Sequence, residues 1–132
     1  MIGFLYRAAD RLRRRRRPED HGRIGEDLAH RHLRQNGCTV IARNYRTLSG
    51  SGEIDLVAWD GERLAIVEVK TRSRTDFGTP DSAVDAGKRD RVMRAARDYA
   101  RRADIPWEKI RFDIVSIVLS PAPTIEWLRD AF

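Results

Sequence analysis

Apolar side chains recur at helical spacing in two segments of the chain. In residues 22–35, Ile24, Leu28 and Leu33 fall close to one face, and Gly37 stands where a C-terminal helix cap belongs. Residues 85–103 repeat this spacing, and Pro106 stops the pattern. The apolar positions of this second segment are Val92, Ala95, Ala96, Tyr99 and Ala103. We therefore predict two helices that each bury one face.

The segments between and after these helices are typical of β-strands. The strand-like segments are residues 39–46, 53–59, 63–71 and 110–119, with a short last strand at 124–128. Asp60-Gly61 predicts a hairpin turn, because glycine accepts a positive φ. Residues 72–84 are rich in Ser, Thr, Gly, Pro and Asp and predict a loop. The order α-β-β-β-α-β, with one extra strand, predicts a single α/β domain whose mixed sheet is flanked by helices.

The positive charge of the chain lies mostly at its N-terminus. The formal net charge is +6, yet residues 1–20 hold seven Arg against three acidic residues, which leaves +2 for the rest. The arginines at 13–17 repel one another, and Pro18 ends any helix. We interpret residues 1–20 as a mobile basic arm and residues 21–132 as the folded domain. The arm is either simply solvated, in contact with phosphates, or a membrane-surface helix, for which its apolar face is short.

Several classes of protein are excluded by the composition. No stretch approaches the roughly 20 apolar residues that span a bilayer, and the apolar start of the chain is too short for a signal peptide. The single cysteine, Cys38, excludes an intrachain disulfide framework and a Cys-rich zinc site. We therefore expect a cytoplasmic protein that does not span a membrane. Its moderate positive charge is compatible with a nucleic-acid partner.

Charged residues interrupt two adjacent apolar strands. Because side chains alternate between the faces of a strand, Glu68 and Lys70 share one face of the strand over 63–71. A two-residue loop at Asp60-Gly61 makes Asp55 a diagonal neighbour of Glu68, and a four-residue loop pairs the two directly. Both registers place Asp55, Glu68 and Lys70 on the same face of the sheet. Glu53 also falls on this face and is a candidate supporting acid or ligand.

Two carboxylates at such a distance repel each other, and partial burial increases the cost. A hard divalent cation with oxygen ligands, Mg²⁺ or Mn²⁺, would offset both charges and could activate a water beside a phosphate. Lys70 could then orient that water or stabilise charge on the phosphate. The alternative is a structural cross-strand ion-pair cluster on a wet face of the sheet. The apolar character of both strands argues against this alternative.

The sequence around these charges resembles the D…ExK core of the PD-(D/E)xK nuclease superfamily. The segments concerned are Gly52-Glu53-Ile54-Asp55-Leu56-Val57 and Val67-Glu68-Val69-Lys70-Thr71-Arg72. More closely, the chain from about Gly22 to Phe132 resembles the YraN family of small bacterial proteins, which are predicted to be endonuclease-like. Further motifs of this resemblance are Gly25-Glu26, Asn44-Tyr45-Arg46, Phe77-Gly78, Lys88, Arg111-Phe112-Asp113 and Ala131-Phe132.

The resemblance implies a restriction-endonuclease-like core, similar to that of archaeal Holliday-junction resolvases. It implies that Asp55 and Glu68 are metal-binding carboxylates and that Lys70 is the catalytic lysine. It also implies that Glu26 is an acidic residue near the metal, although a carboxylate at the start of a helix is favoured by the helix dipole alone. Resolvase-like nucleases often act in pairs, so a homodimer is compatible with the resemblance.

Together these features predict a metal-dependent endonuclease that hydrolyses DNA phosphodiester bonds, at branched or damaged DNA, with Mg²⁺ or Mn²⁺. The alternative is a non-catalytic nucleic-acid-binding module that retains the nuclease fold. A third interpretation is an interaction protein whose acidic cluster is structural. The basic residues expected to contact phosphates, in the predicted loop and on the second helix, are Arg72, Arg74, Lys88, Arg91 and Arg94.

Overall fold

The computed structural model describes residues 19–74 and 84–132. The expected basic arm therefore lies outside the described residues, apart from its last two, and so does the Phe77-Gly78 motif. The elements are α2 (Glu19–Gln35), β1 (Thr39–Arg46), β2 (Glu53–Asp60), β3 (Arg63–Arg74), α3 (Ala86–Arg102), the 3-10 helix η1 (Trp107–Lys109), β4 (Ile110–Ser120) and β5 (Thr124–Leu128). Their order confirms the predicted α/β fold, including the short last strand.

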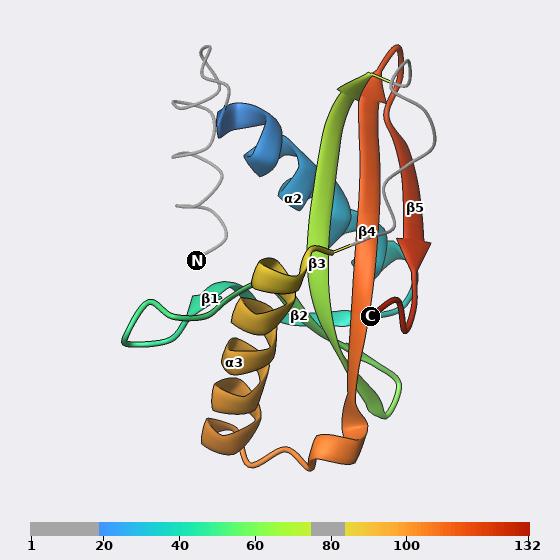
Figure 1. Cartoon of the computed structure of the whole chain (residues 1–132). Helices are drawn as coiled ribbons and strands as arrows, with labels where there is room; N and C mark the ends of the chain where they lie inside the picture. Colours follow the sequence, from blue (N-terminus) through green and yellow to red (C-terminus); the bar gives the residue numbers. More distant parts are fainter. Residues whose placement is uncertain (1–18, 75–83) are drawn as a thin grey trace, which may run out of the picture.

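All five strands form one mixed sheet in the order β1-β2-β3-β4-β5. β3 and β4 run parallel, and the other neighbouring pairs are antiparallel. The parallel pair needs a crossover connection, and α3 lies within it. Figure 1 shows the long strands β3 and β4 side by side, while the connection between β1 and β2 projects away from them.

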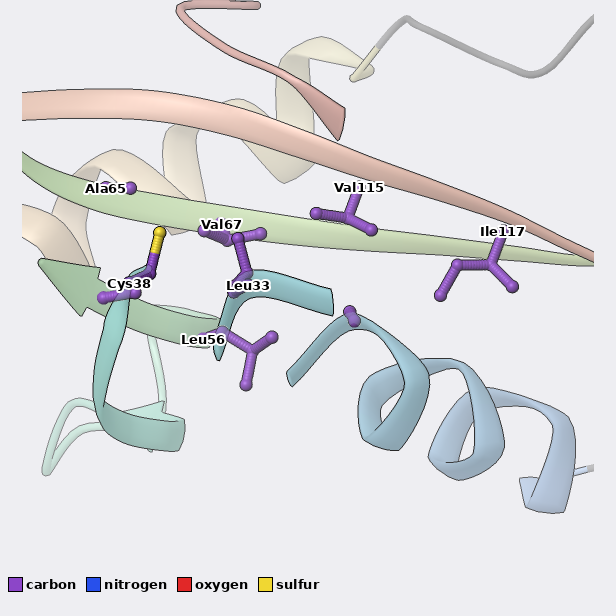
Figure 2. Close-up of a cluster of buried hydrophobic side chains, with 9 residues drawn as sticks. Leu33, Cys38, Leu56, Ala65, Val67, Val115 and Ile117 are labelled. Atoms are coloured by element: carbon purple, nitrogen blue, oxygen red, sulfur yellow. The ribbon is translucent and has the colours of Figure 1, made fainter. Parts of the chain in front are cut away.

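The two helices cover opposite faces of the sheet. Ala29 and Leu33 of α2 pack on one face, where the buried Cys38 also lies, and Figure 2 shows this cluster between α2 and the strands. Val92 and Ala96 of α3 pack on the other face. The predicted buried face of α3 is correct except at Ala103, which is exposed because it caps the end of the helix. Within the described residues, no helix has the length and apolar character needed to cross a membrane.

The hairpin between β2 and β3 selects one of the two registers considered above. Trp59 pairs with Leu64, which is the register considered for a four-residue loop. Asp60 and Arg63 pair as well, so that only Gly61 and Glu62 remain in the turn. The other register, with a two-residue loop at Asp60-Gly61, is not adopted. Gly61 has φ +61°, and a two-residue hairpin turn with glycine first requires a positive φ at that position.

The strand β3 extends further than its sequence predicts. Arg72 pairs with Val118 and Arg74 with Ser120 in β4, so both arginines belong to a strand, and the prediction of a loop from residue 72 is wrong. Their sequence carries no apolar alternation. The hydrogen-bonding groups of the parallel neighbour β4 keep this part of the chain extended, which is a tertiary effect that local propensity does not report.

A buried ion pair anchors the end of the sheet near the hairpin turn. Asp113 is fully buried and accepts hydrogen bonds from Arg111 at 2.8 and 2.9 Å and from Trp127 Nε1 at 3.0 Å. The same guanidinium also donates to Asp60 at 2.9 Å. Because every buried charge here has an opposite partner, the Arg111-Phe112-Asp113 motif serves the fold by joining β2, β4 and β5.

Candidate functional site

Asp55 lies where β2 and β3 separate. The ladder between these strands ends at the pair Leu56 and Val67, one position before Asp55 and Glu68 would meet. The Asp55 carboxylate takes over the next hydrogen bond, because its Oδ2 accepts the Val69 backbone N–H at 2.8 Å. The side chain is thereby held in the opening between the two strands.

The alternation of side chains along β2 also changes at this point. Ile54 and Val57 both pack in the cluster beneath α3, although a regular strand would send them to opposite faces. On the neighbouring strand β1, Asn44 has φ +51°, a left-handed conformation that asparagine tolerates better than most residues. The sheet is therefore irregular at Asp55 on both strands, which directs this carboxylate towards groups from both helices.

Glu68 faces Asp55 from β3 and carries the most perturbed carboxyl group of the site. Its side chain is only 8% exposed, and Oε2 is buried without a hydrogen-bond partner. Burial and the charge of Asp55 raise the pKa of Glu68 to about 8. Burial also raises the pKa of Asp55, although the Val69 N–H opposes this. The pair therefore holds a proton near neutral pH when no cation is bound.

Glu26 approaches Asp55 from α2. Burial and the charge of Asp55 raise the pKa of Glu26, while a hydrogen bond from Asn44 and the charge of Arg43 lower it. The helix comes this close because residue 25 is glycine: a Cβ there would lie 1.8 Å from the Thr71 hydroxyl oxygen. The Gly25-Glu26 motif thus combines a close helix–strand contact with an acidic side chain beside the site.

Lys88 lies in the first turn of α3 and completes the cluster from the other face. Its ammonium donates to Glu53 Oε1 at 2.9 Å and lies 3.4 Å from Glu68 Oε1. Burial lowers the pKa of Lys88, but the hydrogen bond to Glu53 and the neighbouring carboxyl charges raise it, and the net shift is upwards. The hydrogen bond from Lys88 is also the largest cause of the lowered pKa of Glu53.

The predicted catalytic lysine and the predicted phosphate-binding arginines differ in how exposed they are. The β3–β4 ladder is regular through Lys70, which keeps Lys70 on the same face as Glu68 and half-buried. Arg72 is half-buried, and Arg74 is exposed near the end of β3. Two further basic residues, Arg91 and Arg94, are exposed on α3. The charge of Arg91 is among those that lower the pKa of Glu53, so it lies near the acidic cluster.

Two residues of the site, Lys88 and Asn44, make contacts that do not follow from the sequence. The sequence predicts that Lys88 contacts phosphates and gives no signal for its bonds to Glu53 and Glu68, although Lys88 is the one lysine of a helix whose other cations are arginines. The hydrogen bond that lowers the pKa of Glu26 comes from Asn44, a residue known only from the motif Asn44-Tyr45-Arg46. These contacts depend on how the helices pack against the sheet, which the spacing of residues along the chain does not report.

The arrangement supplies oxygen donors to a hard cation but not a complete ligand set. Within residues 19–74 and 84–132, no group of three or more His, Cys, Asp or Glu side chains is placed to hold a metal ion. Two carboxyls, Asp55 and Glu68, face each other, and the unpartnered Glu68 Oε2 is a buried oxygen that lacks a donor. Mg²⁺ is commonly held in this way, by one or two carboxylates with water and substrate phosphates in the remaining positions.

Comparison with known proteins relates the chain to bacterial sequences of unassigned role. The profile of the uncharacterised protein family UPF0102 matches residues 25–117, which include Glu26, Asp55, Glu68 and Lys88. A UPF0102 protein of Solibacter usitatus is 76% identical over 132 residues, the full length of both chains. One of Nocardia farcinica is 45% identical over 113 residues (84% of this chain, 87% of the relative), and one of Dictyoglomus turgidum is 40% identical over 114 residues (84% and 95%).

Proposed function

The chain belongs to the uncharacterised protein family UPF0102, and we propose that it is a metal-dependent endonuclease that hydrolyses DNA phosphodiester bonds. The observation that carries the proposal is the facing pair of Asp55, which is half-buried, and Glu68, which is buried. Both have raised pKa values at the point where two strands separate, and Glu68 has an unpartnered oxygen. Such an arrangement costs stability unless a cation compensates it, and perturbed carboxyls of this kind concentrate at functional sites.

The donor chemistry fits Mg²⁺ or Mn²⁺. The candidate ligands, Asp55 and Glu68, offer only oxygen, and the single cysteine, Cys38, is buried in the core beneath α2. Since two carboxylates leave most coordination positions open, phosphate oxygens and water would fill them. A bound ion of this type polarises a phosphate oxygen and lowers the pKa of a coordinated water.

The side chains of the protein would perform the remaining tasks. Asp55 and Glu68 would hold the ion, and the Val69 N–H keeps the Asp55 carboxylate oriented for this role. Lys70 would orient the attacking water or stabilise the charge that develops on the phosphate. Glu26, whose pKa is raised in part by the charge of Asp55, would assist as a hydrogen-bond acceptor near the water.

The substrate would bind through its phosphates. Arg74, Arg91 and Arg94 are exposed and carry the fixed positive charge that such contacts use. Arg72 and Lys88 are less accessible, being half-buried, and Lys88 is already engaged by carboxylates. We therefore expect the exposed arginines to contribute most of the salt-dependent affinity.

A second candidate function is nucleic-acid binding without turnover. The observation that favours it is the ammonium of Lys88, which occupies the acidic cluster and supplies a positive charge without any metal. In that case Asp55 and Glu68 would be retained as part of a stable ion-pair cluster, and the exposed arginines would still bind phosphates.

The decisive experiment incubates the protein with labelled branched, nicked and single-stranded DNA in Mg²⁺, Mn²⁺ or EDTA. We expect cleavage that requires the ion and is lost in Asp55→Asn and Glu68→Gln. The matched control is Glu62→Gln, in the exposed hairpin turn, which should cleave as the wild type does. Lys70→Met should lose cleavage while keeping Mn²⁺ binding.

The same assay separates the candidates. Cleavage that persists in EDTA, or in both carboxylate variants, would refute the proposed site. DNA binding without cleavage under any of these ions would favour the binding module. If the protein binds neither Mn²⁺ nor DNA, both candidate functions are rejected.

A further inference from the structure

Two features place the backbone of Lys88 beside the acidic cluster. Asp85 caps α3, and its side chain accepts the Lys88 backbone N–H at 2.8 Å, so the helix begins at a defined residue. Gly52, just before β2, lets α3 pack closely: a Cβ there would lie 2.7 Å from the Arg91 carbonyl oxygen and 2.8 Å from the Ala95 nitrogen. The start of the helix is thereby held beside Glu53.

The contacts of Lys88 are those of a counter-ion. Its ammonium bonds Glu53 at 2.9 Å and approaches Glu68 at 3.4 Å, and its side chain is only 21% exposed. The contact with Glu53 is the closer of the two, and the contact with Glu68 is longer. A half-buried ammonium of this kind partly neutralises carboxyls that would otherwise be buried without compensation.

A divalent cation at Glu68 would meet this ammonium. Both would draw on the oxygens of the same carboxylate, and two positive charges a few ångströms apart repel each other strongly in a half-buried site. The lysine side chain is a flexible chain of four methylene groups. The hydrogen bond to Glu53, which is shorter than the contact with Glu68, can therefore hold the ammonium by itself. Lys88 can therefore leave Glu68 without leaving the site.

We propose that Lys88 is a built-in counter-ion of the acidic cluster that competes with a divalent cation for Glu68 and moves onto Glu53 when the cation binds. The displacement rests on the proposed metal site, whereas the counter-ion role does not. It assigns Lys88 a positioning role: the residue stabilises the cation-free protein and sets how tightly the metal is held.

The test combines Mn²⁺ titration calorimetry with thermal melts in EDTA on the full chain. We expect Lys88→Met to bind Mn²⁺ at least about fivefold tighter than the wild type, the lower end of usual couplings between ligands. Lys88→Arg keeps the charge and should bind Mn²⁺ less tightly than Lys88→Met. The matched control is Lys109→Met, an exposed lysine beyond the opposite end of α3, which should bind as the wild type does.

In EDTA, Lys88→Met should lower the melting temperature, and this loss should be smaller in a Glu53→Gln background. Absence of that coupling overturns the counter-ion role. Mn²⁺ binding by Lys88→Met that is equal to or weaker than that of the wild type overturns the displacement. If the coupling is present but no variant binds Mn²⁺, the displacement fails together with the proposed function, and Lys88 is a permanent counter-ion.

Discussion

The raised pKa of Glu68 makes the stability of the cation-free protein depend on pH. Burial and the charge of Asp55 raise this pKa from 4.5 to about 8. A carboxyl whose pKa is higher in the folded than in the unfolded state stabilises the fold fully below the unfolded value, and this contribution is lost as pH rises through the folded value. The loss should therefore fall between pH 4.5 and about pH 8.

The structure limits the size of this effect. At about 1.36 kcal/mol per pH unit, the interval from 4.5 to about 8 corresponds to at most roughly 5 kcal/mol of unfolding free energy. Glu68→Gln removes the titrating group while keeping its size. From pH 5 to pH 8.5 we expect the wild type to lose about 2–4 kcal/mol more than the variant.

Urea unfolding in EDTA, followed by tryptophan fluorescence at several pH values, measures this difference. Glu62→Gln is the control, because its side chain lies in the exposed hairpin turn, and its pH profile should follow that of the wild type. With saturating Mn²⁺ the wild type should instead gain stability as pH rises, since metal binding requires ionised carboxylates. A constant difference between wild type and Glu68→Gln from pH 5 to pH 8.5 would refute the reasoning.

Three further predictions concern the scaffold and the ion. Gly25→Ala should reduce the unfolding free energy in urea by about 1–3 kcal/mol or more, because its Cβ would lie 1.8 Å from the Thr71 hydroxyl, and Thr71→Ala should restore part of the loss. Asp113→Ala should cost about 3–5 kcal/mol in the same assay, because it leaves the Arg111 guanidinium without its bidentate partner. Mn²⁺ should raise the melting temperature of the wild type but not of Asp55→Asn, and an equal rise in both would place the ion elsewhere.

The sequence was sufficient for the hairpin that carries the two acids. Side chains alternate along a strand, and a short turn leaves few registers, so Asp55 and Glu68 had to lie near each other whichever register formed. The structure selects direct alignment and then ends the ladder one pair earlier, at Leu56 and Val67. The early end of the β2–β3 ladder leaves the Val69 N–H for the Asp55 carboxylate. The apolar pattern of the sequence does not predict where this ladder ends.

The contacts made by the helices were not predictable in the same way. Where α3 begins relative to β2 depends on the crossover and on the packing at Gly52, so the distance from Lys88 to Glu53 is a tertiary property. The extension of β3 to Arg74 likewise depends on β4, its parallel neighbour. The positive φ of Asn44 had a partial signal, since asparagine is enriched in that conformation, but the sequence alone does not say which asparagine adopts it.

The distribution of cations in the molecule follows the difference between arginine and lysine. The fully buried Asp113 is neutralised by Arg111, whose planar guanidinium makes two parallel bonds that fix geometry and resist displacement. The chain has only three lysines, and two of them, Lys70 and Lys88, lie on the strand of Glu68 and on the helix turn that contacts it. An ammonium is a point charge on a flexible side chain, so it can move away from a carboxylate when a divalent cation binds there. Lys88→Arg should therefore hold the acidic cluster more rigidly and exchange less readily with Mn²⁺ than the wild type does, which the calorimetric titration compares directly.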